Sequence, residues 1–479
     1  MSASRLLPLF GFIATLVLLL HVQPALSADV RSCGAKGDGQ ADDTAAIQKA
    51  VDSGNGRVSF PKGVYRITKP VIIELDKTGF TSLAGDGVAR VVMAGAGAAF
   101  RFVGTHASSA DPDQVKPNVW ERQRMPMVDG LEIVGAHPEA DGIEATGTMQ
   151  ITITRTTVRD ARHGIRLATR NRNVLIADCH IYHNRGIGVF YDDVNLHQSN
   201  ISGCHISYCA GGGIVSRGGN VRNIHIGTCD IEMNMATNAP PTANVLIDCS
   251  GSSAGTAEVA ITGCTIQHGG KPAGGANIRI IGRGNPAKNR PVARWGHVTI
   301  TGNVLSDVKV NVHLRDARGV VITGNTFYMG YEHDLLVEDS SNIVVGPNNF
   351  DRNPLYGYGD AAKVNGGVVF RGSSDCTLDG LHINGAWRKP AALMIEKCNR
   401  FNIANCTILD SDNIGLLLKD VTNSKVADCM IRDDRRDAKP GPSLKVEGGR
   451  WNWVLQNLLA NGCEAAPAAA RVEGNHDGR

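Results

Sequence analysis

The sequence predicts an all-β fold, a right-handed parallel β-helix of about 13 coils with a short N-terminal capping helix. Three observations predict it: a short phrase recurs with a base period near 24 residues, an alternating strand follows most copies, and no helical periodicity appears from Asp129 to Asn461. A fixed period of this size is the signature of a solenoid. Because the repeats contain only strands, the solenoid is a β-helix and not a stack of helical units.

The repeated phrase is an apolar residue, two or three small polar residues, a Cys or Asn, one variable residue and a closing apolar residue. Clear copies occupy 176–181, 201–206, 226–231, 261–266, 300–305, 322–327, 403–408 and 426–431. Looser copies end at Ile133, Val158, Phe350, Ile383 and Leu459. The spacing between copies grows where loops are inserted, so the coils carry turns of unequal length.

The second strand of each coil shows the alternation that distinguishes a strand from a helix. Its inward apolar pairs are Ile165 and Leu167, Val245 and Ile247, Ile278 and Ile280, Val312 and Leu314, Leu335 and Val337, and Leu393 and Ile395. Stacking these strands from coil to coil gives the second wall of the solenoid.

Six of the twelve cysteines share the Cys or Asn position of the phrase: Cys179, Cys204, Cys229, Cys264, Cys406 and Cys429. Stacked strands lie about 4.8 Å apart, whereas a disulfide needs Cβ atoms nearer about 3.8 Å. We therefore expect most cysteines to be free, buried thiols. Disulfides and metal ligation are the alternatives.

The ends of the chain predict three segments. Residues 1–28 carry Arg5, an apolar run and small residues, which is typical of a signal peptide. Residues 29–463 are then one domain, with a cap motif in 29–70 and a capping helix near 44–53, and 464–479 are a disordered tail. We expect a secreted, periplasmic or cell-surface protein with no membrane span after signal cleavage. A net charge of +3 without a polybasic tract argues against nucleic acid as a partner.

The cap motif carries a resemblance to a known family. Residues 33–47, CGAKGDGQADDTAAI, followed by FPKGVY at 60–65, resemble the opening of the pectate-lyase-like superfamily, including its rhamnogalacturonase and epimerase types. The resemblance implies this same β-helix and a polysaccharide partner. The superfamily contains lyases, hydrolases, epimerases, phage tailspikes and proteins without known activity, so the reaction stays open.

Aligned second strands place one outward residue of each coil in a column whose charges alternate, from Asp192 through Arg217 and Asp248 to Glu447. Most of this column is expected to be a salt-bridge ladder. A uronate lyase needs a base beside a cation that neutralises the sugar carboxylate. Arg217 as base, with calcium held by Asp192 and Asp248, is the hypothesis that the column favours.

A glycoside hydrolase with an atypical carboxylate pair is the second hypothesis, since such enzymes need two carboxylates. Asp192, Asp193 and Glu232 are its candidates. Residues 211–213 and 168–170 lack the motifs that the polygalacturonase-like members carry there. The candidate substrate-binding residues for either enzyme are Arg279, His268, Tyr356 and Tyr358.

A non-catalytic carbohydrate-binding or cell-surface scaffold is the alternative from another class, which the missing motifs and the charge ladder favour. A second outward column, with Val215, Leu246, Leu336, Val369, Met394 and Leu417, is apolar for a solvated face. An insertion loop or a second copy of the chain in a homo-oligomer is expected to cover it.

Overall fold

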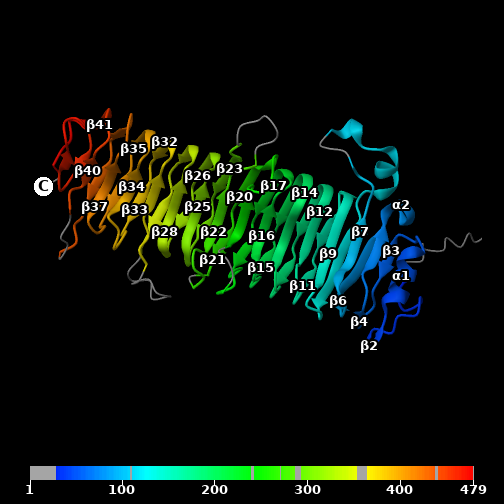
Figure 1. Cartoon of the computed structure of the whole chain (residues 1–479). Helices are drawn as coiled ribbons and strands as arrows, with labels where there is room; N and C mark the ends of the chain where they lie inside the picture. Colours follow the sequence, from blue (N-terminus) through cyan, green and yellow to red (C-terminus); the bar gives the residue numbers. More distant parts are fainter. Residues whose placement is uncertain are drawn as a thin grey trace, which may run out of the picture.

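The computed structural model describes residues 28–107, 111–238, 242–269, 271–285, 293–352, 364–436 and 441–477. These residues form a long right-handed parallel β-helix that runs from the blue N-terminal end to the red C-terminal end in Figure 1. The signal peptide expected in residues 1–28 lies outside the described residues, except for Ala28. No helix among the described residues is long and apolar enough to cross a membrane.

The coil has three parallel walls, which we call the first, second and third sheets in the order in which the repeat visits them. Four long strands bend from one wall into the next: β6 (Ser82–Met93) and β8 (Met127–Gly135) join the first to the second, and β12 (Ile165–Ala177) and β14 (Ile187–Ser202) join the third to the first. The remaining strands each belong to one wall.

The first sheet also contains β1 (Ala28–Asp29), β3 (Arg57–Ser59), β10 (Thr152–Thr154), β17 (Asn220–Gly227), β20 (Gly255–Thr262), β23 (Gly296–Thr301), β26 (Arg318–Thr323), β29 (Ser341–Val345), β32 (Ser374–Asp379), β35 (Asn399–Ala404), β38 (Lys425–Ala427), β41 (Asn452–Leu455) and β44 (Ala470–Glu473). The second sheet also contains β2 (Asp38–Asp42), β4 (Gly63–Ile67), β11 (Thr157–Arg159), β13 (His180–Tyr182), β15 (His205–Ser207), β18 (Asp230–Glu232), β21 (Thr265–Gln267), β24 (Val304–Leu305), β27 (Thr326–Phe327), β30 (Asn349–Asp351), β33 (His382–Asn384), β36 (Thr407–Leu409), β39 (Met430–Arg432) and β42 (Leu458–Leu459). The third sheet also contains β5 (Val71–Glu74), β7 (Gly97–Val103), β9 (Ala140–Met149), β16 (Gly212–Arg217), β19 (Ala243–Asp248), β22 (Ala276–Ile281), β25 (Val308–Arg315), β28 (Gly330–Glu338), β31 (Val368–Arg371), β34 (Ala391–Glu396), β37 (Ile414–Lys419), β40 (Leu444–Glu447) and β43 (Cys463–Ala465).

The repeat predicted from the sequence is confirmed in its register. All thirteen closing apolar residues, from Ile133 to Leu459, pair with their equivalents in the neighbouring coils of the second sheet. The inward residues of the third sheet are buried, with Ile165, Leu167, Val312 and Leu314 each 0% exposed. Stacking therefore gives one continuous apolar core along the axis.

Ladders of hydrogen-bonded Asn side chains inside the turns connect successive coils. Between the second and third sheets, Asn234 Nδ2 donates to Asn244 Oδ1 at 3.0 Å, and Asn244 Nδ2 donates to Asn277 Oδ1 at 2.8 Å. The ladder continues through Asn311 to the carboxylate of Asp334. Burial raises the pKa of Asp334 to about 7. A similar ladder joins Asn303, Asn325 and Asn348 at the turn between the first and second sheets.

The cap helix is confirmed as α1 (Thr44–Asp52), which buries Ile47, Ala50 and Val51 against the N-terminal end of the core. The cap block does more than the sequence analysis expected, because β3, β4, β5, β6 and β7 add rungs before the first predicted coil. A short helix, α2 (Leu75–Thr78), lies beside α1.

An insertion, described at 104–107 and 111–124, rises over the edge between the third and first sheets and is drawn in cyan at the top of Figure 1. It contains the 3₁₀-helix η1 (Pro112–Gln114) and the π-helix η2 (Val119–Gln123). Its Val115 and Val119 pack on Met149, so this insertion is fixed to the solenoid by an apolar contact of its own.

The predicted disordered tail at 464–479 is wrong for the residues that the structure describes. Ala470–Glu473 forms β44 and pairs with β41, and Asn457 Nδ2 donates to Asn475 Oδ1 at 2.8 Å. The stretch 465–470 has a low-complexity composition, but the exposed edge of the last coil supplies unpaired backbone groups for it to bond.

All twelve cysteines are free, and ten of them are buried, which confirms the predicted thiol column. The thiols lie over backbone carbonyls: Cys204 Sγ, for example, is 3.3 Å from the carbonyl oxygen of Ser202. Thiol titration of the denatured, unreduced protein should accordingly find all or nearly all cysteines reactive.

The ladder predicts a large effect of removing one rung. Asn277→Ala deletes the acceptor of Asn244 and the donors to Asn311 Oδ1 and the Ser306 carbonyl, all in a fully buried site. We expect the free energy of unfolding to fall by about 2–4 kcal/mol, measured by urea denaturation. Asn402→Ala, on the exposed face of β35, is the matched control and should change it by less than about 0.5 kcal/mol.

Candidate functional site

The outward charge column of the third sheet has the register that the sequence predicts. Asp192 pairs with Arg217, and Arg217 pairs with Asp248, in β14, β16 and β19. Further along, Arg371 lies 3.7 Å from Glu338 and 3.4 Å from Glu396, and Lys419 lies 3.0 Å from Glu396. This C-terminal part of the column is the salt-bridge ladder.

Arg217 differs from these ladder residues. Asp192 accepts from the guanidinium of Arg166, with Nε at 2.8 Å, and Asp248 accepts from the backbone and hydroxyl of Ser250 at 3.0 and 2.6 Å. Arg217 is exposed, and no carboxylate of the described residues lies within salt-bridge distance of it. The carboxylates of Asp192 and Asp248 therefore lie on the neighbouring strands without forming a salt bridge to the Arg217 guanidinium.

Asp193, also predicted as a catalytic residue, has a role in the turn. Its Oδ1 accepts from the backbone N–H of Gly219 at 2.8 Å, and its φ of 43° is left-handed. The carboxylate thereby joins two successive turns between the third and first sheets.

The calcium site predicted at Asp192 and Asp248 stays a prediction. The two residues are separated by two coil spacings, roughly 10 Å between backbones, with Arg217 between them. Among the described residues, no three His, Cys, Asp or Glu side chains gather closely enough to hold a metal ion. The geometry fits a calcium ion poorly, since Asp192 is already engaged by Arg166.

Arg279, predicted to bind substrate, is 7% exposed and lies in the second outward column, where it holds loops in place. It donates to the carbonyls of Thr242 and Gly274 and to His313 Nδ1, and burial lowers its pKa to about 10. The apolar members of this column form a buried cluster with Ile187, Phe190 and Val310. Each apolar residue of this column is at most 9% exposed, so the chain itself covers these side chains.

A different group of titratable side chains gathers at the edge between the second and third sheets. His268 Nε2 lies 3.8 Å from Glu232 Oε2, and His268 Nδ1 lies 3.8 Å from Asp307 Oδ2. Glu232 also accepts from the Tyr208 hydroxyl at 3.0 Å and from Gln267 Nε2 at 3.4 Å. Burial raises the pKa of Asp307, whose side chain is only 8% exposed. One imidazole thus stands between two carboxylates.

This group borders a cleft of about 650 Å³. The cleft is lined by Met233, Met235, Thr237, His268, Gly269, Lys271, Pro272, Asp307, Lys309 and Tyr331. Lys309 lies 5.8 Å from the centre of the Tyr331 ring. Beside Glu232, the exposed Tyr208 packs on His183 with ring centres 5.1 Å apart. The cleft therefore offers two lysines and aromatic rings around the imidazole.

The predicted residues thus divide between two places. Glu232 and His268 lie near the start of β19, because Asn234, two residues after Glu232, donates its backbone N–H to Asn244. Asp192, Arg217 and Asp248 lie at the opposite, C-terminal ends of their third-sheet strands. Asp248 lies four residue steps along β19 from Asn244, or roughly 13 Å. Tyr356 and Tyr358 lie outside the described residues.

Asp307 was missed in the sequence, although a signal for it exists. Asp307 occupies the turn position that His268 occupies one coil earlier, and both have left-handed φ angles, 59° and 61°. The same position holds His183, Tyr208 and Met233 in earlier coils. Aligning the turns, and not only the strands, would have placed Asp307 beside His268.

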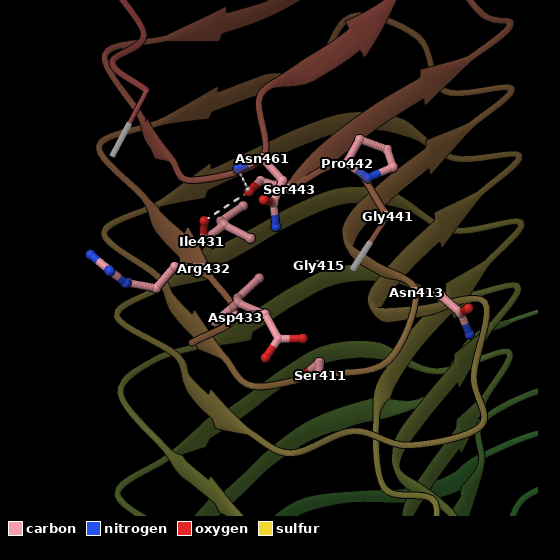
Figure 2. A pocket seen from close by; sticks show the side chains of 11 residues that line it. Ser411, Asn413, Gly415, Ile431, Arg432, Asp433, Gly441, Pro442, Ser443 and Asn461 are labelled. Atoms are coloured by element: carbon pink, nitrogen blue, oxygen red, sulfur yellow. Dashed lines mark hydrogen bonds between the residues drawn. The ribbon is translucent and has the colours of Figure 1, made fainter. Parts of the chain in front are cut away.

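Another hollow, between the second and third sheets near the C-terminal end, is too small to be a binding site. Figure 2 shows Ser443 within it, donating to the Ile431 carbonyl at 2.9 Å and accepting from the Asn461 N–H at 3.0 Å. Its volume of about 10 Å³ is that of one water molecule at most.

Two family descriptions match the chain. Residues 27–127 match the family described as rhamnogalacturonase A/epimerase, pectate lyase-like. Residues 128–266 and 245–360 match the family described as right handed beta helix region. Together these matches run over the cap block and most of the coils.

A probable glucan endo-1,3-beta-glucosidase of Arthroderma benhamiae is 33% identical over 105 residues, which is 19% of this chain and 11% of the fungal protein. Among solved structures, bacteriophage phi29 gene product 12 has a TM-score of 0.54 at 14% identity, over 94% of this chain and 57% of that one. A mutant tailspike of E. coli bacteriophage HK620, solved with a pentasaccharide, has a TM-score of 0.52 at 13% identity, over 89% of this chain and 80% of that one. At these identities the structural matches show the fold alone.

The burial of Asp307 predicts a pH-dependent effect on stability. A carboxyl with a raised pKa in the folded state stabilises the fold while protonated, and this contribution is lost as pH rises through the folded pKa. Asp307→Asn should therefore gain stability over the wild type as pH rises from about 4 to neutral. Thermal unfolding across this pH range measures the difference.

Asp160→Asn is the control, at the equivalent turn position of an earlier coil. Asp160 is half-exposed and pairs with Arg159 at 2.5 Å. Its substitution should give no gain at neutral pH. A gain of equal size in both variants would contradict the assignment to burial.

Proposed function

Because this chain belongs to the pectate-lyase-like superfamily of right-handed parallel β-helix proteins, we propose that it cleaves an acidic polysaccharide by general acid–base hydrolysis in the cleft beside His268. The observation that carries the proposal is the single imidazole that stands 3.8 Å from a carboxylate on each side, Glu232 and Asp307, at the wall of a 650 Å³ cleft.

The two carboxylates have separate roles in this proposal. Asp307 is the general acid, because its raised pKa keeps the proton on the carboxyl to higher pH, ready for the leaving oxygen of the glycosidic bond. Glu232, held by Tyr208 and Gln267, is the base that activates water. Each carboxylate lies 3.8 Å from a different nitrogen of the His268 ring. Inverting hydrolases hold their two carboxyl groups roughly 6.5–9.5 Å apart, which leaves room for the attacking water. His268 positions both carboxylates.

The acidic class of substrate is proposed from the rim of the cleft. Lys271 and Lys309 place two positive charges there, and Tyr331 and Tyr208 offer ring faces to sugar. A polymeric substrate suits a cleft that lies open along a row of turns. It also suits the secreted, periplasmic or cell-surface location that we propose from the N-terminal segment.

The test is a panel of uronate-containing and neutral glycans, incubated with purified protein, with and without calcium. Hydrolysis releases reducing ends without an unsaturated product. Glu232→Gln and Asp307→Asn should each lower turnover about 100-fold or more, since each removes one proton-transfer group. For Asp307, the alkaline limb of the pH–rate profile should also disappear.

Arg371→Ala is the control, since its ladder lies several coils away between Glu338 and Glu396. It should leave turnover unchanged. Full activity of both carboxylate variants, or no cleavage of any glycan, would count against hydrolysis in this cleft. In the latter case the non-catalytic carbohydrate-binding scaffold would be the better account.

A uronate lyase centred on Arg217 is the second candidate, and the unpaired guanidinium between Asp192 and Asp248 favours it. In this reaction Arg217 would remove the proton beside the sugar carboxylate. Elimination leaves an unsaturated product that absorbs in the ultraviolet. Arg217→Ala should then abolish this absorbance change while Glu232→Gln retains it, the reverse of the result expected for the cleft.

A further inference from the structure

Two tryptophan side chains are exposed near the C-terminal end of the solenoid. Trp453 lies on the outer face of the first sheet in β41, which Figure 1 labels at that end, and Trp451 lies in the turn directly before this strand. Trp451 is 64% exposed, the largest fraction among the large apolar side chains that the structure describes, and Trp453 is 52% exposed. Indole rings carry a large apolar area and are typical of interaction surfaces, so this pair points to a binding face.

The backbone that carries the two rings is fixed from the inside. Asn452, between them in the sequence, points inward and is 1% exposed. Its Nδ2 donates to the carbonyl oxygens of Val421 at 2.7 Å and Ala469 at 3.0 Å, and its Oδ1 accepts from the N–H of Ser424 at 3.1 Å. These partners belong to the coils before and after. The segment is therefore ordered without a ligand, which lowers the entropy cost of binding one.

Trp451 occupies a turn position that suits other residue types. Its φ of 60° is left-handed, a conformation that Gly, Asn and Asp adopt readily and that is unfavourable for a bulky side chain. Asn423 holds the equivalent position one coil earlier, and Gly319 holds it in an earlier coil. Arg400, also at this position, forms an ion pair with Asp375. An exposed indole gains no burial in return for this backbone conformation, so we look for its benefit in binding.

Cationic side chains surround the rings. Trp453 is in register with Lys425 of the coil before and with Arg471 of the coil after, each at the coil spacing of about 4.8 Å. The guanidinium of Arg471 lies 5.9 Å from the centre of the Trp453 ring. The guanidinium of Arg450 lies 4.2 Å from the centre of the Trp451 ring. Each indole thus has a positive charge beside it.

Two of these cations are available to a ligand. Arg471 pairs with Glu473, whereas Lys425 and Arg450 form no ion pair with any residue that the structure describes. A ligand that brings apolar C–H faces to the indoles and negative charge to the cations complements this face. Every unit of a uronate chain carries both.

A second copy of the chain fits this face poorly. In a two-fold dimer the same patch meets itself, so Lys425 and Arg450 would face the same cations of the other copy. A neutral glycan would leave both charges without a counterpart.

We propose that Trp451 and Trp453, with Lys425 and Arg450, form a surface site that binds an acidic glycan without cleaving it. The rings stack on the sugars, and the cations pair with the carboxylates. The site lies on the outer face of the first sheet, whereas the candidate cleft lies at the edge between the second and third sheets. Binding here does not depend on whether the cleft cleaves bonds.

The first experiment follows the tryptophan fluorescence of the full-length protein during quenching by acrylamide. The probes are trigalacturonate, trimannuronate and the neutral methyl ester of trigalacturonate, at low salt. At least one of the two uronates should protect the exposed indoles, and the ester should bind severalfold more weakly than trigalacturonate. The described residues that line the cleft include no tryptophan, so the protection reports this site. Glu232→Gln, at the cleft, should give the same Kd as the wild type.

The second experiment compares variants of the face. Trp453→Ala and Trp451→Asn should each weaken uronate binding about tenfold or more. Trp451→Asn should also melt at or above the wild-type temperature, because Asn suits the left-handed turn. Lys425→Gln should weaken binding of the uronate and leave binding of the ester unchanged. Val321→Ala, which removes an exposed apolar side chain from the same outward column, is the matched control and should bind like the wild type.

The proposal is overturned if neither uronate protects the indoles, or if both tryptophan variants bind as tightly as the wild type. A clear fall in the melting temperature of Trp451→Asn would contradict a binding role for the indole and assign it to the fold. Dimerisation in sedimentation that Trp453→Ala abolishes would identify a second copy, and not a glycan, as the occupant.

Discussion

The in-register stacking of coils is the constraint on which the rest of this structure depends. Each turn amide donates to the next along the axis, as Asn244 does to Asn277 and Asn277 to Asn311. These bonds are buried, so a slip of one residue would leave several polar groups unsatisfied at once. The same slip would turn the buried apolar side chains of the strand toward solvent. The ladders and the apolar core therefore fix the register together.

Once the register is set, every turn position becomes a column on the outer surface, and chemistry depends on which side chains the columns juxtapose. The ladder near Arg371 places opposite charges in neighbouring coils, where they form ion pairs. At the cleft, the turn positions of successive coils bring His268 against Asp307. The same stacking therefore produces a structural column of ion pairs and a group of titratable side chains.

The fold and its register were accessible from the sequence because period-two strands and a repeating turn phrase are local signals. All thirteen phrase copies and the whole charge column stack as expected. The candidate functional site was harder to predict from the sequence, because inserted loops determine which of its side chains are exposed. The sequence predicts Arg279 as an exposed, substrate-binding cation, but the loops at Thr242 and Gly274 bury it. Asp307 has no marker except its turn position, and the paired end of the chain at β44 depends on an edge that only the last coil creates.

The column of free thiols bears on how such a chain reaches its native state. Cys179, Cys204, Cys229 and Cys264 are each buried in the stacked coils. The neighbouring Cys179 thiol, together with burial, raises the pKa of Cys204 to about 12, which suppresses the reactive thiolate. Exposed thiols of an unfolded chain have ordinary pKa values and can be oxidised. In an oxidising compartment, folding is therefore a kinetic competition in which coil addition must outpace disulfide formation. If oxidation is faster, disulfides form between cysteines that lie in different coils of the native protein and are not bonded there. The yield of folded protein should therefore depend on redox conditions during folding and become insensitive to them once the coils have stacked.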